Sequence, residues 1–394
     1  MPPVTEKPPA EKDHELLVEL EERTGKVESS NGLAIVFGIV SLGLIIGVAV
    51  LLVALNGDSG STGANVEPPA QASQEAQPAA DTEHSQASHA ASDAGAAKVE
   101  AYERPDPTLP AVPAGAVKKF RMDVFEHVTK VSNDQPATRV WSYGINGKFH
   151  RGTGVSPPMV VEVGDKVEIN LVNGASKAMD VRFPHSIDFH SSEIAPNKAF
   201  KTVPPGGSHS FSFVAKLPGV FMYHCATDPV LMHTGAGMVG MMVVKPKNLP
   251  AVDRELWFTQ QEYYIGKPGA DADPAKMAEK NPDVIAFNGF AAQYKDTPIE
   301  VKRGERIRAY VMNAGPSIWS AFHVIGTVFD KSVVEGVTGK HAQTINLAPS
   351  QGGYVEFTLD DEGNFPFVTH AFGDMVKGAV GVFATEGAPK GAAH

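Results

Sequence analysis

An internal repeat is the feature that most limits how this chain of 394 residues can fold. The segments VEVGDKVEINLVN, GVFMYHC and GMVGMMVV are similar to IEVKRGERIRAYVMN, GNFPFVT and GAVGVFA, at an offset of 138–144 residues. Both copies contain short apolar or alternating runs separated by Gly, Pro, Asn and Asp, which is typical of strands in a β-sandwich. The sequence therefore predicts an all-β fold with two tandem domains, residues 101–248 and 249–388, followed by a C-terminal tail, residues 389–394.

The N-terminal region has a different character. Residues 33–55 form an uncharged apolar run, long enough for a helix to cross the roughly 30 Å hydrocarbon core of a bilayer. A cleaved signal peptide is the main alternative, but the run is long for that purpose and 32 residues precede it. Arg23 and Lys26 precede the run, and no Lys or Arg occurs in residues 56–97, so the N-terminus is expected in the cytoplasm. We thus expect a cytoplasmic tail (1–32), one transmembrane helix (33–55), a flexible Ala/Ser/Pro-rich linker (56–100), and β-domains on the periplasmic or extracellular side of the cell membrane.

The acidic charge of the chain is concentrated before the β-domains. The formal net charge is −11, from 34 basic and 45 acidic side chains. Residues 1–97 hold 4 basic and 14 acidic side chains, whereas residues 98–394 hold 30 and 31. The β-domains are therefore nearly neutral overall. Without an excess of basic residues, the chain is not expected to bind nucleic acid.

The single cysteine of the chain belongs to a pattern of metal ligands. Cys225, His233 and Met238 lie in YHCATDPVLMHTGAGM, and FPHSIDFH contributes His185. A thiolate and two imidazoles in a plane, with a long axial thioether contact, are the ligands of a blue copper site. The alternative is a buried apolar cysteine with a core methionine. Four ligands at these spacings favour the copper site.

Strand alternation predicts a second site beside the first. If FPHSIDFH is extended, His185 and His190 face opposite ways, and so do the adjacent residues Cys225 and His224. His190, His224 and Asp188 would then share the outer face. Two imidazoles and a carboxylate indicate a second copper, open to substrate and one peptide link from the first. Because two imidazoles hold copper poorly, a further imidazole is needed, and the second repeat offers two candidates, His323 and His370.

These motifs resemble the copper-containing nitrite reductases, an NO-forming family with two cupredoxin domains, over nearly all of residues 115–388. The resemblance implies Greek-key cupredoxin folds and one type 1 and one type 2 copper per chain. It also implies catalytic roles and a homotrimer that shares ligands between subunits. By this resemblance the type 1 ligands are His185, Cys225, His233 and Met238, and the type 2 ligands are His190, His224 and His370 of a neighbouring subunit. Asp188 and His323 match the catalytic residues, and Ile325 matches the residue that shapes the nitrite pocket.

The activity implied is dissimilatory reduction of nitrite to nitric oxide and water, with one electron delivered to type 2 copper from type 1 copper. The donor would be a partner such as a cytochrome c or a small cupredoxin. The chain departs from many members in three features. The loop from Cys225 to His233 is one residue shorter, Val328 replaces a second histidine, and an N-terminal anchor is present.

Two other functions remain as alternatives. A membrane-tethered cupredoxin relay would use type 1 copper alone, and it would have no need of Asp188, His190, His323 or His370. A two-domain laccase would need paired histidines in H-x-H motifs for its trinuclear cluster, and none of the 14 histidines is two residues from another. One, two or four coppers per chain would indicate a relay, a nitrite reductase or a laccase, respectively.

Overall fold

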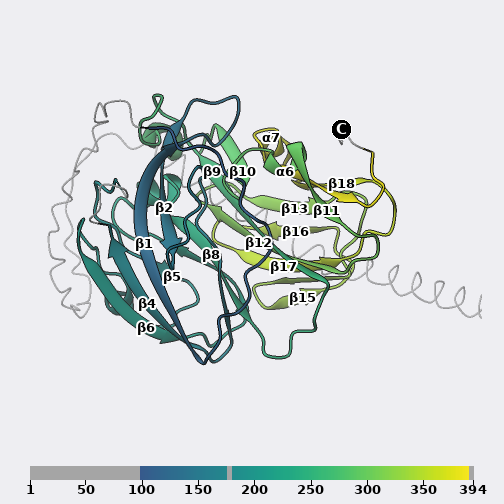
Figure 1. The fold of residues 1–394 in the computed structure, drawn as a ribbon, viewed down its shortest axis with the longest axis horizontal. Helices are drawn as coiled ribbons and strands as arrows, with labels where there is room; N and C mark the ends of the chain where they lie inside the picture. The colour runs from purple at the N-terminus through teal and green to yellow at the C-terminus, as the bar shows by residue number, and fades with distance from the viewer. Residues whose placement is uncertain (1–97, 175–179, 390–394) are drawn as a thin grey trace, which may run out of the picture. The chain divides into compact units, whose positions relative to one another are not determined.

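The computed structural model describes residues 98–174 and 180–389 (Figure 1). The predicted tail (1–32), the transmembrane helix (33–55), nearly all of the linker and residues 390–394 lie outside the described residues. Across the described ranges, no helix has both the length and the apolar character needed to cross a bilayer.

The first repeat forms two four-stranded sheets, with strand orders β2-β1-β4-β6 and β3-β8-β7-β5. Two short helices lie between their strands. The elements are β1 (Val117–Thr129), β2 (Thr138–Ile145), β3 (Met159–Glu162), β4 (Lys166–Asn173), β5 (Asp188–Phe189), α3 (Pro196–Ala199), β6 (Ser208–Val214), β7 (Gly219–His224), α4 (Val230–Gly235) and β8 (Val239–Lys245).

Alternation of apolar and polar side chains explains how these strands form a core. In β4, Val167, Ile169 and Leu171 are buried, while the residues between them are polar or less buried. Successive side chains on a strand point to opposite faces, so the three apolar residues lie on one face. They belong to a cluster that also contains Phe189 and Cys225. The core of the first repeat therefore extends to the segment that carries the only cysteine.

The second repeat forms a six-stranded sheet, with order β10-β9-β12-β17-β14-β15, and a five-stranded sheet, with order β11-β19-β18-β13-β16. Three short helices accompany them. The elements are β9 (Arg254–Tyr263), α5 (Pro274–Ala278), β10 (Val284–Phe287), α6 (Gln293–Asp296), β11 (Thr297–Val301), β12 (Ile307–Gly315), β13 (Ser320–Val324), β14 (Lys331–Val334), β15 (Val337–Gly339), β16 (Thr344–Leu347), β17 (Gly352–Phe357), β18 (Asn364–Thr369), α7 (Phe372–Met375) and β19 (Val380–Thr385).

The two repeats have corresponding strand pairings. β1 runs parallel to β4 in the first repeat, as β9 runs parallel to β12 in the second. The antiparallel pair β7–β8 corresponds to β18–β19. Among the described strands, each sheet takes its members from one side only of the predicted boundary at residues 248–249 (Figure 1). The predicted all-β fold class is confirmed.

The repeats pack closely where β7 meets β17. Val220 and Met222 of β7 share an apolar cluster with Tyr310 and Met312 of β12. A Cβ atom at Gly352 would lie 2.6 Å from the backbone oxygen of Val220, so this approach requires glycine. This contact fixes β7, the strand that leads directly to His224 and Cys225, against the second repeat.

Candidate metal centres

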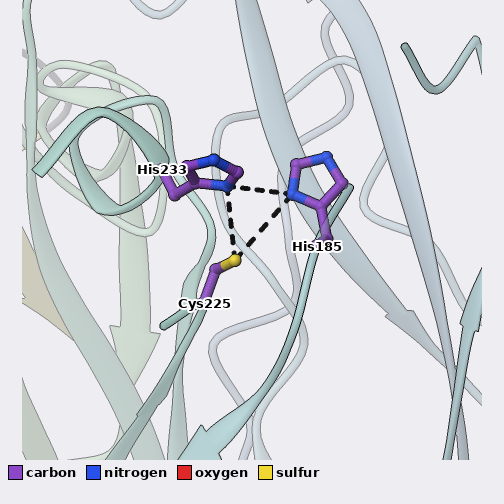
Figure 2. A group of neighbouring side chains, drawn as sticks. All are labelled: His185, Cys225 and His233. Carbon is purple, nitrogen blue, oxygen red and sulfur yellow. Dashed lines mark hydrogen bonds between the residues drawn. The ribbon is translucent and has the colours of Figure 1, made fainter. Parts of the chain in front are cut away.

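Three side chains converge in the interior of the first repeat (Figure 2). His185 Nδ1 lies 3.1 Å from His233 Nδ1, and Cys225 Sγ lies 3.3 Å from His233 Nδ1 and 3.9 Å from His185 Nδ1. All three residues are buried. We call His185, Cys225 and His233 the buried group. Its three potential ligand atoms point toward one common position.

Backbone hydrogen bonds fix each member of the buried group. His185 pairs with Val203 through two bonds of 3.0 and 2.8 Å. Cys225 N donates to Met238 O at 3.0 Å, and Met238 N donates to His233 O at 3.1 Å. Met238 is fully buried. The structure therefore holds the fourth residue of the predicted set beside Cys225 and His233.

The buried group favours a thiolate. Burial raises the pKa of the Cys225 thiol, but the His185 and His233 imidazoles beside Sγ lower it more, so that the pKa lies well below its usual range. The backbone N–H of Ser186 also donates to Sγ at 3.3 Å. A thiolate with two imidazole nitrogens is a soft donor set that suits copper. The residues of the buried group thus fit the metal that the sequence predicts.

A second convergence lies at the end of β5 and β7. Asp188 and His224 are directly paired across these two strands. His224 Nε2 lies 3.2 Å from His190 Nε2 and 3.6 Å from Asp188 Oδ2, and His190 Nε2 lies 4.0 Å from the same oxygen. We call Asp188, His190 and His224 the outer group, because its side chains are more exposed than those of the buried group.

Electrostatics keep a nitrogen lone pair available in the outer group. Partial burial lowers the pKa of His190, the neighbouring His224 lowers it further, and Asp188 raises it. The net shift is downward, so His190 is neutral at neutral pH. A neutral imidazole is the form that binds metals. Two imidazoles and a carboxylate oxygen fit a copper ion.

The two groups are linked by one peptide bond. His224 is the last residue of β7 and belongs to the outer group, whereas Cys225 follows it and belongs to the buried group. The opposite directions of the two side chains agree with the alternation expected from the sequence. The predicted partition of His185, His190, His224 and Cys225 between two faces corresponds to the observed grouping.

His323 and His370 lie together in the second repeat. Their ring centroids are 5.5 Å apart, and His370 stacks on Phe372 with a centroid distance of 4.5 Å. Ile325 and Val328, the other two residues singled out in this region, are 41% and 52% exposed. Within the described ranges, neither His323 nor His370 belongs to a three-residue ligand group. The structure of one chain does not bring them to the outer group.

The structure also places residues that the sequence did not indicate around His185. Glu126 of β1 is buried and has a carboxylate oxygen 3.6 Å from His185 Nε2. Trp141 of β2 lies with its ring edge-on to both His185 and His233, at centroid distances of 5.3 and 5.0 Å. The available signal was an acidic residue within the segment VFEHV of a strand that is otherwise mainly apolar, but only the three-dimensional structure shows what it faces.

Comparisons with known proteins point to copper proteins. The multicopper oxidase family matches residues 127–249. The chain is 35% identical over 283 residues to copper-containing nitrite reductases of Neisseria gonorrhoeae and Neisseria meningitidis serogroup A. These alignments cover 68% of this chain and 69% and 70% of those proteins. Among solved structures, the copper nitrite reductase from Nitrosomonas europaea aligns with a TM-score of 0.62 and 27% identity, covering 69% of this chain and 94% of that one.

Proposed function

Because this chain belongs to the copper-containing nitrite reductases, we propose that its buried and outer groups are its two copper sites and that nitrite is reduced at the outer group. The observation that carries this proposal is the direct succession of His224 and Cys225, which belong to different groups. An electron-storing site and a substrate site are thereby one peptide link apart.

The buried group has the composition of a type 1 copper site. His185, Cys225 and His233 would supply two Nδ1 atoms and a thiolate to a copper, and the buried Met238 would supply a thioether. Their burial excludes water and substrate, which suits a site that only stores and passes an electron. The outer group is more exposed and corresponds to the type 2 site. Copper held by these residues would supply the electron and a Lewis acid for nitrite.

A second copy of the chain would complete the outer group. We propose that His370 of a neighbouring subunit is the third imidazole and that the assembly is a homotrimer. The surface near His370 supports this, because Trp319, Phe372 and Val376 are 57%, 53% and 75% exposed. Large apolar side chains exposed together often mark a subunit interface.

His323 would reach the site with His370. Since the two rings lie 5.5 Å apart on one chain, the copy that donates His370 must also donate His323. Each active site would then combine Asp188, His190 and His224 of one subunit with His323 and His370 of the next. Ile325, which is 41% exposed and lies two residues after His323, would border the bound nitrite.

Asp188 and His323 would handle the two protons of the reaction NO₂⁻ + 2H⁺ + e⁻ → NO + H₂O. Asp188 Oδ2 faces the two imidazoles of the outer group and can hold a proton against a substrate oxygen. His323 Nδ1 lies against the carbonyl of Gln343, which can only accept, so Nδ1 carries a proton. Nε2 of His323 is therefore the nitrogen that exchanges a proton with nitrite or water.

The alternatives fit the side chains less well. A cupredoxin relay needs only the buried group, and the outer group would then have no function. A laccase-type trinuclear cluster needs histidines paired in H-x-H motifs, and the sequence contains no such motif.

We also propose that both repeats are Greek-key cupredoxin domains within residues 101–388.

The N-terminal region would attach the enzyme to a membrane. We propose that residues 33–55 anchor the chain and that the linker holds the catalytic part on the periplasmic or extracellular side of the cell membrane. A cytochrome c or a small cupredoxin on that side would donate the electron. Retention of the full chain in carbonate-washed membranes would test the anchor.

Copper counting combined with product detection tests the central proposal. The full-length protein is loaded with copper, its copper content is measured, and nitrite is added under anaerobic conditions with an artificial reductant. We expect two coppers per chain and nitrite-dependent release of nitric oxide. One copper without nitric oxide would indicate a relay, and four coppers with oxygen consumption would indicate a laccase.

A further inference from the structure

The Nε2 atom of His185 is a buried polar atom with an unusual environment. The His185 side chain is completely buried, and among the described residues Nε2 has no hydrogen-bond partner. Its other ring nitrogen, Nδ1, faces Cys225 and His233. When Nδ1 binds a metal, the ring proton must reside on Nε2. A buried N–H of this kind needs an acceptor.

Glu126 supplies a carboxylate at the correct place. Its Oε1 atom lies 3.6 Å from His185 Nε2, and its side chain is also completely buried. Oε1 accepts a hydrogen bond from Arg182 N at 2.9 Å and still has a second lone pair. A shift of a few tenths of an ångström would bring His185 Nε2 into hydrogen-bond distance.

A chain of charged residues holds Glu126 in position. Arg182 Nε donates to Glu126 Oε2 at 2.8 Å, and Arg182 Nη2 donates to Asp271 Oδ1 at 2.5 Å. Asp271 also accepts a bond from Trp141 Nε1 at 3.2 Å. Trp141 is the fully buried residue that packs edge-on against both imidazoles of the buried group. The Glu126 carboxylate is thus connected to the imidazoles of the buried group by two routes. One is its direct approach to His185, and the other runs through Arg182, Asp271 and Trp141.

Asp271, the partner of Arg182, belongs to the second repeat. It lies between β9 and α5, and the segment before it is bound to the region at the start of β2 in the first repeat. Gly269 N donates to Ala137 O at 2.7 Å, and Arg139 N donates to Ala270 O at 2.8 Å. The second repeat therefore helps to fix a carboxylate beside a ligand of the first repeat.

We propose that Glu126 is a positioning residue that accepts the Nε2 proton of His185 when Nδ1 binds copper, and that Arg182 and Asp271 hold its carboxylate in place. This inference rests on the proposed copper-binding role of the buried group. Metal-bound histidines commonly donate their second N–H to a carboxylate, which fixes the ring and makes it a stronger donor. A stronger imidazole donor favours oxidised over reduced copper. Glu126 therefore lowers the reduction potential of the type 1 site, and Arg182 moderates this effect by drawing charge from the carboxylate.

Glu126→Gln is the main test, made in the full-length, copper-loaded protein. We expect a higher reduction potential of the type 1 copper in a spectroelectrochemical titration, and a roughly ten- to hundredfold weaker affinity for that copper. The matched control is Glu193→Gln, which removes a 51% exposed carboxylate that pairs with Lys216, and it should change neither quantity. A folded Glu126→Gln protein with unchanged potential and affinity would overturn the proposal, because Glu126 would then only pair with Arg182.

Asp271→Asn provides a second test if Glu126→Gln does not fold. The Asp271 side chain is 18% exposed, and an asparagine oxygen can still accept the bond from Trp141. Without the Asp271 charge, Arg182 should draw more charge from Glu126, so we expect a smaller rise in the potential. An unchanged potential in this variant would refute the positioning chain. Absence of any copper at the buried group of the unmodified protein would instead refute the proposed function.

Discussion

Asp188 and His224 face each other directly across the β5–β7 ladder, with Asp188 Oδ2 3.6 Å from His224 Nε2. The carboxylate therefore lies within reach of both a proposed copper ligand and any substrate bound there. It is held by strand pairing and not by a flexible loop. Because strand pairing fixes its backbone, Asp188 can be substituted with little effect on the positions of the other residues of the site.

Asp188→Asn is expected to retain both coppers and to lose most nitrite turnover. Asparagine has nearly the same shape but cannot transfer the proton, and loss of a general acid typically costs about 10²–10⁴-fold in rate. The measurement is kcat with an artificial reductant, together with copper content. A kcat within threefold of the unmodified enzyme would show that another group delivers the proton.

Mixing two inactive variants tests whether each active site spans two subunits. Asp188→Asn and His323→Asn chains should each be nearly inactive alone. When they are co-expressed in one trimer, some interfaces combine an intact Asp188 with an intact His323 from the next subunit. Random assembly should restore about a quarter of the wild-type sites. No recovery in isolated mixed trimers would mean that both residues act within one chain.

Local alternation made much of the fold and site predictable. The period of two in VEVGDKVEINLVN identifies a strand, and the adjacency of His224 and Cys225 is enough to place them on opposite faces. The short helix α4, which carries His233, has only six residues, and such a length shows no helical periodicity. Its position is set by tertiary contacts and could not be predicted.

Contacts between distant segments were the part that the sequence could not predict. Arg182 bonds to Glu126 and Asp271, which are 56 and 89 residues away. Likewise, His323 and His370 meet because β13 lies beside β18. Strand order within a sheet depends on global packing, which periodicity does not encode. The residues around the proposed ligands were therefore missed, although the sequence pattern did predict the proposed ligands themselves.

Cys225→Ala should abolish the blue colour and the entry of electrons from a protein donor. The two imidazoles of the buried group hold the pKa of the Cys225 thiol well below its usual range, so that it is a thiolate. Alanine offers no donor atom at this position. The outer group should keep its copper, because its three side chains are unchanged. Visible absorption, electron paramagnetic resonance and donor-driven turnover provide the measurements. Undiminished turnover with a protein donor would disprove the role of the buried group in electron supply.

Acid sensitivity of the fold should depend on His127, a buried residue of β1. Its Nε2 lies 3.0 Å from the carbonyl of Thr153, and Nδ1 has no partner among the described residues. Burial lowers the pKa of His127 to about 4, the bond to Thr153 raises it, and the nearby Arg151 and Arg139 lower it further. The unfolded chain, with an ordinary pKa near 6.5, binds the proton more readily.

The difference between the folded and unfolded pKa values of His127 sets the direction in which stability changes with pH. Between pH 6.5 and about 4 the unfolded state holds more protons on this residue, so the free energy of unfolding falls as the pH falls. The stabilisation from neutral His127 is complete above pH 6.5, and about 2 kcal/mol of it is lost by pH 5.

The variant His127→Gln tests this, because glutamine keeps a donor for the Thr153 carbonyl but cannot titrate. Its loss of stability between pH 7 and pH 5 should be smaller by that amount, measured by urea unfolding at one fixed protein concentration. Exposed His341→Asn is the control and should behave like the unmodified chain. Equal pH dependence in all three proteins would show that His127 is not the acid-sensitive group.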